Sequence, residues 1–208
     1  MSASGANMQE VQEKISVNDQ GLRERKRLET HARIQAEGMR LFLDRGFEAT
    51  TLDEVAQAAD VSRRTLLNYF GSKEEIVFSA KAGFPQVVAD AIAARPADEP
   101  LLDMVENALV DLAQQPQSEE TKAVAILIHG TPSLRAGDQA KYEQVERLLA
   151  EALAARKGVA SDDIACRVVA GTAVSIMKLS LDAWLAHPDA PPETFGREAF
   201  AALRRAAG

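Results

Sequence analysis

The residues best suited to chemistry lie in one short run, SRRTLLNYF, at positions 62–70. If this run is helical, Leu66 and Phe70 share one face. The opposite face then presents four side chains: Arg63, Arg64, Leu67 and Asn68. Arginine can bind O6 and N7 of guanine, asparagine can bind N6 and N7 of adenine, and leucine can contact a thymine methyl group. This set is therefore suited to the major groove of duplex DNA.

Further polar and basic residues surround that face. Four of them are candidates for contacts to DNA phosphates: Ser62, Thr65, Tyr69 and Lys73. A basic stretch, RERKR at positions 23–27, comes earlier in the chain, and Arg25 within it is expected to lie along phosphates or to enter the minor groove. The alternative is that Arg63 and Arg64 only solvate an exposed helix face, as most surface arginines do.

Three capped helix starts within 22 residues position these side chains. Thr51 with Glu54 forms a capping box, Ser62 caps the next helix, and Ser72 with Glu75 opens a further one that runs toward Pro85, where we expect a kink or break. An earlier helix is indicated by apolar residues at helical spacing and ends at Gly46; its buried face contains Ile34, Gly38, Leu41 and Phe42. Two short helices joined by a turn at residues 59–61 are the helix-turn-helix pattern.

The segment MRLFLDRGFEATTLDEVAQAADVSRRTLLNYFGSKEEIV, residues 39–77, resembles the DNA-binding region of the TetR family of transcriptional regulators. The resemblance implies an all-helical homodimer, usually a repressor, whose C-terminal part binds a small effector and thereby releases operator DNA. It also implies that Thr51, Tyr69 and Lys73 hold phosphates and that residues 62–68 form the recognition helix. Two residues depart from the family pattern. Asp60 replaces a common Gly in the turn, where Asp still tolerates a left-handed backbone, and Leu67 replaces a common Tyr.

Composition and charge agree with this interpretation. The 208 residues are 46% hydrophobic and rich in helix formers, so we expect an all-α protein with a substantial core. The formal net charge is −7, yet residues 23–73 hold ten Lys or Arg and eight Asp or Glu. The one cysteine, Cys166, forms no internal disulfide, and no leader segment opens the chain, so the cytoplasm is the expected compartment.

The rest of the chain is expected to be a series of amphipathic helices, at about residues 101–112, 119–129, 134–156, 161–186 and 193–206. The apolar stretch at 164–186 contains Arg167, Lys178 and Asp182, so we expect a buried helix and no contact with a membrane. We divide the chain into a flexible arm (residues 1–21), a DNA-binding domain (22–72) and an effector-binding and dimerisation domain (73–208).

Two sites are predicted in the C-terminal domain. An apolar effector pocket between helices, with a polar group from His129 or Trp184, is assigned to Phe84, Met104, His129, Met177 and Trp184. Alternatively, these side chains only fill the core. Small residues at 165–175 allow another helix to approach closely, so Gly171, Val174 and Ser175 are assigned to a dimer interface, with core packing as the alternative.

We expect the two recognition helices of a dimer to lie about 34–36 Å apart on DNA and the effector to change this spacing through the helix that begins at Ser72. No Ser-His-acid set, glycine-rich phosphate loop or metal-binding spacing is present, so no enzymatic activity, metal or cofactor is expected. The alternative function is a helix-turn-helix architectural or protein-interaction factor without an effector.

Overall fold

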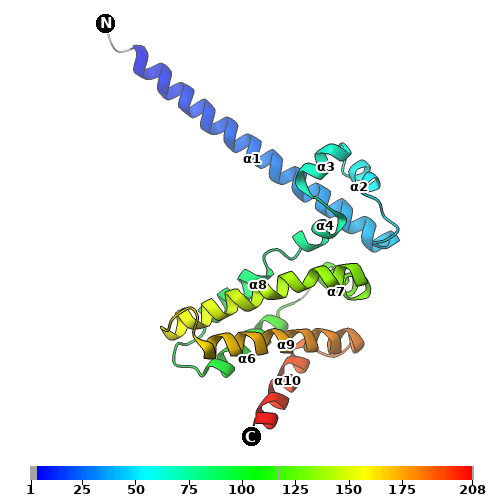
Figure 1. Cartoon of the computed structure of the whole chain (residues 1–208). Helices are drawn as coiled ribbons and strands as arrows, with labels where there is room; N and C mark the ends of the chain where they lie inside the picture. The colour runs from blue at the N-terminus through cyan, green and yellow to red at the C-terminus, as the bar shows by residue number, and fades with distance from the viewer. Residues whose placement is uncertain (1–3, 117, 208) are drawn as a thin grey trace. The chain divides into compact units, whose positions relative to one another are not determined.

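A computed structural model describes residues 4–116 and 118–207, and over these residues the protein contains ten α-helices and no strand. The predicted all-α fold is confirmed (Figure 1). The chain divides between Ala80 and Lys81 into two compact units, residues 1–80 (unit 1) and 81–208 (unit 2).

Unit 1 holds four helices, α1 (Ser4–Arg45), α2 (Leu52–Ala58), α3 (Arg63–Tyr69) and α4 (Lys73–Ser79). The predicted caps are present. Thr51 and Glu54 form the capping box of α2, the Ser62 hydroxyl accepts from the Thr65 amide, and the Ser72 hydroxyl accepts from the Glu75 amide. Each of the three short helices therefore begins where the sequence predicts.

The first helix is longer than expected, because α1 begins at Ser4, whereas residues 1–21 were predicted to be a flexible arm with helix only next to the DNA-binding domain. No proline lies between residues 4 and 45, and Arg, Glu, Gln and Leu, which all favour helices, are frequent there, so the helix continues through this segment. The first three residues of the expected arm lie outside the described residues.

Helix α4 belongs to unit 1. The boundary between the units therefore lies eight residues after the domain boundary that the sequence predicted. Ile76 and Val77 on α4 are fully buried. Gly38 on α1 lets α4 approach, because a Cβ atom at that position would lie 2.9 Å from Ile76 Cγ2. The break predicted at Pro85 occurs at residues 80–83, and Pro85 lies in the first turn of the helix that follows.

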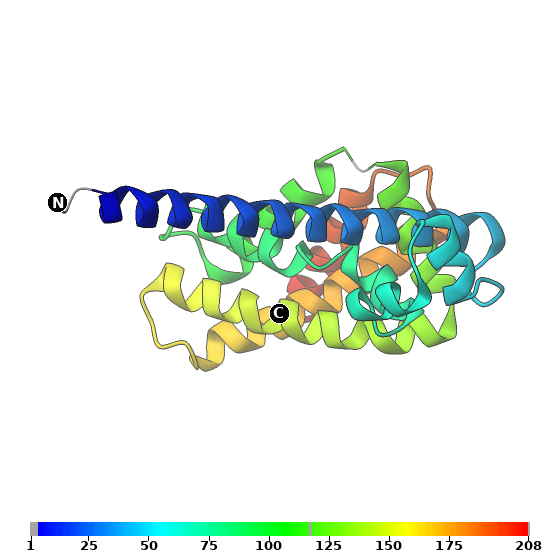
Figure 2. The ribbon, with the colours of Figure 1, turned by 90° about the horizontal axis from the view of Figure 1, so that it is seen from above.

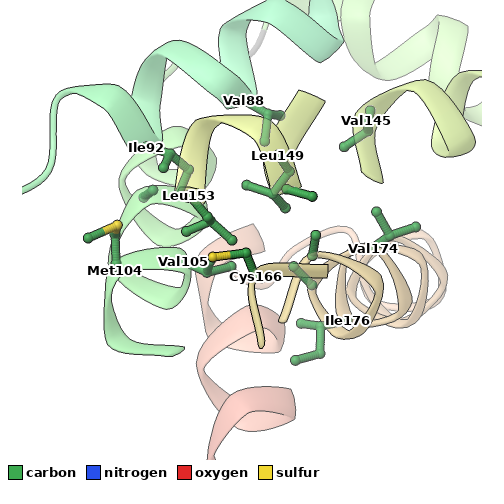
Figure 3. Close-up of a cluster of buried hydrophobic side chains, with 14 of the residues drawn as sticks. Val88, Ile92, Met104, Val105, Val145, Leu149, Leu153, Cys166, Val174 and Ile176 are labelled. Atoms are coloured by element: carbon green, nitrogen blue, oxygen red, sulfur yellow. The ribbon is translucent and has the colours of Figure 1, made fainter. Parts of the chain in front are cut away.

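Unit 2 holds six helices, α5 (Phe84–Ala93), α6 (Leu101–Gln114), α7 (Glu119–Gly130), α8 (Pro132–Lys157), α9 (Ile164–Ala186) and α10 (Pro192–Ala207). The last five lie within a few residues of their predicted bounds, whereas α5 was not predicted as a separate helix. Its Val88 and Ile92 pack with Leu149 and Leu153 of α8 and Met104 of α6 in the core (Figure 3).

Helices α8 and α9 lie side by side and form a hairpin (Figure 2). Gly158 ends α8 with a left-handed backbone at φ +67°, which glycine adopts without steric cost. Asp163 then caps α9 by accepting from the Cys166 amide, and this bond holds the pKa of the Asp163 carboxyl below its usual value.

Among the described residues, the stretch Lys73–Ala93, which contains α4 and α5, and helix α9 (Ile164–Ala186) are long and apolar enough to cross a membrane by length and composition alone. The core helices of many proteins pass the same test, so it is weak evidence. One face of α9 packs in the core through Cys166, Ala170 and Ala173. The other face is exposed, so the prediction of a buried helix is correct for one face only.

Candidate nucleic-acid interface and effector cavity

The turn between α2 and α3 sets the direction of the recognition helix. Asp60 has φ +50°, which confirms that this residue adopts the left-handed conformation expected for the turn. The Arg33 side chain of α1 donates to the Ala59 carbonyl at 2.8 Å, so α1 supports the turn from outside. No sequence pattern indicated this role for Arg33, because its partner is a backbone atom 26 residues away.

The predicted outward face of α3 is confirmed. Leu66 and Phe70 are buried in unit 1. The four side chains assigned to base contacts are exposed: Arg63, Arg64, Leu67 and Asn68. Leu67 is 43% exposed, so its methyl groups are accessible for an apolar contact with a thymine methyl group.

The two arginines of this face differ in their surroundings. Arg63 forms an ion pair with Asp53 of α2, with Nη1 and Oδ2 2.5 Å apart. Among the described residues, no side chain pairs with the Arg64 guanidinium. Arg63 must break its ion pair with Asp53 before it can bind a base edge. Arg64 can bind a base edge in the conformation that the structure shows. Sequence analysis missed the role of Asp53, which is visible only once α2 and α3 are placed.

Two of the hydroxyls assigned to phosphates, those of Thr51 and Ser62, already serve as helix caps. Thr51 Oγ1 donates to Glu54 Oε2 at 2.9 Å, and Ser62 Oγ lies 2.8 Å from Thr65 Oγ1. The backbone and side-chain bonds from Thr51 hold the pKa of the Glu54 carboxyl below its usual value. Thr51 and Ser62 are exposed, so both remain reachable by a phosphate. Tyr69 is half-buried beside the His31 ring.

Lys73 has a structural role that the sequence did not indicate. Its Nζ donates to the carbonyls of Phe47 and Thr50, both at 2.9 Å, and lies 4.6 Å from the centre of the Phe47 ring. These contacts connect the start of α4 to the loop between α1 and α2. An ammonium group has three N–H donors, so one remains for a phosphate.

The basic stretch that contains Arg25 lies on α1 and is exposed. Arg25 Nε is 3.7 Å from Glu29 Oε1, and Arg27 pairs with Glu24 at 2.9 Å. The hydrogen bonds that Arg27 donates to the Glu24 carboxylate raise the pKa of the Arg27 guanidinium. Arg25 is therefore presented from a helix.

Unit 2 contains an apolar cavity of about 210 Å³. Three of the five predicted effector residues line it, Phe84, Met177 and Trp184, together with residues of α6, α9 and α10. Ser180 also lines it, and its Oγ is the one buried side-chain oxygen or nitrogen among the described residues without a hydrogen-bond partner. Ser180 was not predicted, since a single serine in an apolar helix gives no distinct signal.

The other two predicted effector residues do not line this cavity. Met104 is fully buried in the core, where it fills space between helices. His129 lies at the surface, with Nδ1 3.4 Å from Asp182 Oδ1. The prediction that they share a pocket with Phe84 is therefore wrong, because helical periodicity does not say which residues on different helices meet.

Of the three residues predicted for a dimer interface, one is buried in the core and two lie nearer the surface. Val174 is only 5% exposed and belongs to the core of unit 2, so its assignment to an interface is wrong. Gly171 is half-buried, Ser175 is exposed, and both lie on the outer side of α9. Ile164, Val168 and Leu179 on the same helix are between 59% and 68% exposed. Exposed aliphatic side chains in such a row are typical of an interface.

The capped α2–turn–α3 element, with its outward Arg-Arg-Leu-Asn face, defines a helix-turn-helix DNA-binding protein. Two family descriptions match the chain. Residues 34–80 match bacterial regulatory proteins of the tetR family, and residues 99–207 match the MftR C-terminal domain. The chain belongs to the TetR family of transcriptional regulators, as the resemblance in its sequence indicated.

Individual proteins similar to this chain are also described as transcriptional regulators. The transcriptional regulator TcmR of Streptomyces glaucescens is 32% identical over 154 residues, which cover 70% of this chain and 68% of TcmR. MftR of Mycobacterium tuberculosis is 29% identical over 167 residues, covering 77% and 82% of the two chains. The crystal structure of Thermus thermophilus FadR, a TetR family repressor in complex with lauroyl-CoA, is 25% identical, with a TM-score of 0.55 and coverage of 82% and 91%.

Proposed function

We propose that this protein is a cytoplasmic homodimeric repressor that leaves its operator when a small, largely apolar molecule occupies the cavity of unit 2. Membership of the TetR family makes it a DNA-binding transcriptional regulator. The observation that carries the proposal is the presence of two separate features in one chain. One is the exposed α3 face, and the other is a cavity lined by aromatic and aliphatic side chains.

Helix α3 carries the side chains proposed to read the DNA sequence. Arg64 and Asn68 supply base-specific donors, Leu67 supplies an apolar contact, and Arg63 becomes available when it leaves Asp53. Phosphate contacts from Thr51, Ser62, Thr65, Tyr69, Lys73 and Arg25 would set the register of α3 in the groove. Because a single helix covers only a few base pairs, a specific site requires two copies, whose recognition helices lie about 34 Å apart.

The homodimer is supported by α9. The exposed side chains Ile164, Val168 and Leu179 follow one another along its outer face, and the small residues Gly171 and Ser175 lie between them. A two-fold axis places this face against its copy, which would bury the aliphatic side chains.

The size of the cavity limits the effector. An apolar cavity of about 150 Å³ in another protein binds benzene, so a cavity of 210 Å³ has room for about eight or nine non-hydrogen atoms. Larger molecules require the lining residues to move. The binding of lauroyl-CoA by FadR shows that a relative takes a ligand with an apolar chain.

The proposal is tested with operator DNA obtained by selection from random duplexes. Ethylbenzene, an apolar probe with eight carbon atoms, is titrated into the protein–DNA complex, and the DNA affinity is followed by fluorescence anisotropy. We expect a two-fold symmetric selected sequence and at least a tenfold loss of affinity at saturating ethylbenzene.

A variant that fills the cavity makes the test specific. Ala113→Phe places a ring in the cavity and is expected to bind operator normally and ignore ethylbenzene, whereas Ala136→Phe, on the exposed surface of α8, behaves like the wild type. Symmetric DNA binding without any response to probes that enter the cavity would instead favour an architectural factor without an effector.

A further inference from the structure

Two lysines of unit 2 lie over the ring of Tyr142, and a third interacts with one of them. Lys141 Nζ and Lys178 Nζ each lie 4.6 Å from the centre of that ring. Lys81 is close enough to Lys141 for their charges to interact. The three come from different elements, since Lys81 precedes α5, Lys141 is on α8, and Lys178 is on α9.

This lysine cluster (Lys81, Lys141 and Lys178) has too few carboxylates to balance it. Lys141 pairs with the buried Asp138 at 2.7 Å, and Lys178 donates only to the uncharged Gln139 at 3.0 Å. No described carboxylate forms an ion pair with Lys81. Two ammonium groups therefore lack a paired anion in a part of the chain that is acidic overall. Like charges held together without a counter-ion are unfavourable, unless an anion binds between them.

The cluster adjoins the apolar cavity. The Phe84 ring lines the cavity and lies 5.8 Å from Lys141 Nζ. On α9, Lys178 directly follows Met177, which also lines the cavity. A molecule whose apolar part occupies the cavity can therefore extend a polar end toward the lysines past Phe84.

We propose that the lysine cluster is an anion subsite and that the effector is a short amphiphile, with a hydrocarbon part in the cavity and an anionic head held by the cluster where Lys141 and Lys178 meet over Tyr142. This inference rests on the proposed function and defines the chemical class of its effector. Lys141 remains paired with Asp138, so the excess positive charge of the cluster comes from Lys81 and Lys178.

The protonation state of Lys81 should make the affinity of the subsite for an anion depend on pH. Burial and the charge of Lys141 lower the pKa of the Lys81 ammonium to about 8, while Asp138 opposes that shift. Lys178 and Asp182 on α9 are the other charged groups beside Tyr142. Above pH 8 Lys81 loses its proton, whereas an alkyl carboxylate stays ionised throughout. Affinity for the carboxylate should therefore fall as the pH rises through 8.

The test compares octanoate, octyl phosphate and 1-octanol, which share one hydrocarbon chain. Trp184 is the only tryptophan and lines the cavity, so its fluorescence reports binding directly and without DNA. We expect octanoate to bind at least fivefold more tightly than 1-octanol at pH 7, and this advantage to shrink at pH 9. Tighter binding of octyl phosphate than of octanoate would show a phosphate head to be preferred. An apolar cavity alone favours the uncharged alcohol, so equal or tighter binding of 1-octanol at pH 7 overturns the inference.

Substitutions test which lysines produce the preference for octanoate over 1-octanol. Lys81→Gln with Lys178→Gln should remove the preference for octanoate and leave 1-octanol binding unchanged, whereas Lys122→Gln on α7 should change neither. Lys81→Arg keeps the charge at all these pH values, so its octanoate affinity should stay constant from pH 7 to 9. A preference that survives in the double variant contradicts the subsite. If ethylbenzene releases DNA while octanoate shows no advantage, the proposed function stands and the anion subsite fails.

Discussion

Replacing Lys73 with methionine should loosen the loop between α1 and α2 in the free protein. Lys73 Nζ makes two charge-assisted hydrogen bonds, to the carbonyls of Phe47 and Thr50, and a cation–π contact with the Phe47 ring. Bonds of this kind contribute about 1.5–3 kcal/mol each, and the cation–π contact about 0.5–1 kcal/mol. Lys73 is half-buried, so water replaces part of this, and we expect a net loss of about 2–3 kcal/mol.

Hydrogen exchange followed by mass spectrometry measures this loss locally. A loss of about 2–3 kcal/mol speeds exchange of protected amides in peptides covering residues 46–58 by about 30- to 150-fold. Lys26→Met is the control, because Lys26 is an exposed lysine of α1, and we expect its rates to stay within about twofold of wild type. Equal exchange in the two variants would refute the structural role of Lys73 and leave only its expected contact to phosphate.

Three further predictions concern other parts of the chain. Val168→Arg on the exposed face of α9 should give a folded monomer, whereas Val174→Arg should unfold unit 2 because it buries an unpaired charge; analytical ultracentrifugation and circular dichroism separate the two. Asp60→Val should lower the free energy of unfolding in urea by about 1–2 kcal/mol, because Asp60 has φ +50°, while Asp60→Gly should change it by less than about 0.5 kcal/mol. Lys81→Met should raise the melting temperature at pH 7. The folded-state pKa of Lys81, about 8, lies below its ordinary value of 10.5, so wild-type stability rises toward that of the variant between pH 8 and 10.5, and the difference in melting temperature should be smaller at pH 9 than at pH 7.

The helix-turn-helix was predictable because its determinants are local in sequence. Thr51, Ser62 and Ser72 each cap a helix through an amide three residues ahead, so the pattern is visible in one short window. The outward face of α3 follows from the same helical spacing that buries Leu66. The left-handed backbone of Asp60 agrees with the glycine that the family resemblance places in this turn, a conformation that Asp tolerates.

Contacts between distant residues were not predictable in this way. Periodicity placed Val174 on α9 but did not reveal that its side of the helix meets the core, and it grouped Met104 with Trp184 although only the latter lines the cavity. The pairing of Arg63 with Asp53 depends on the angle between α2 and α3. These features arise from packing, which one sequence specifies only through all of its residues together.

The central claim is that α3 recognises base sequence, and the most direct measurement compares base preferences in selections from random duplex DNA. The wild type should enrich a two-fold symmetric site. Arg64→Ala should lose its preference at one base pair in each half, a change of about 1–3 kcal/mol, and keep the rest. Arg45→Ala, at the exposed end of α1, should retain the full motif. An unchanged motif in Arg64→Ala, or no motif in the wild type, would contradict this account.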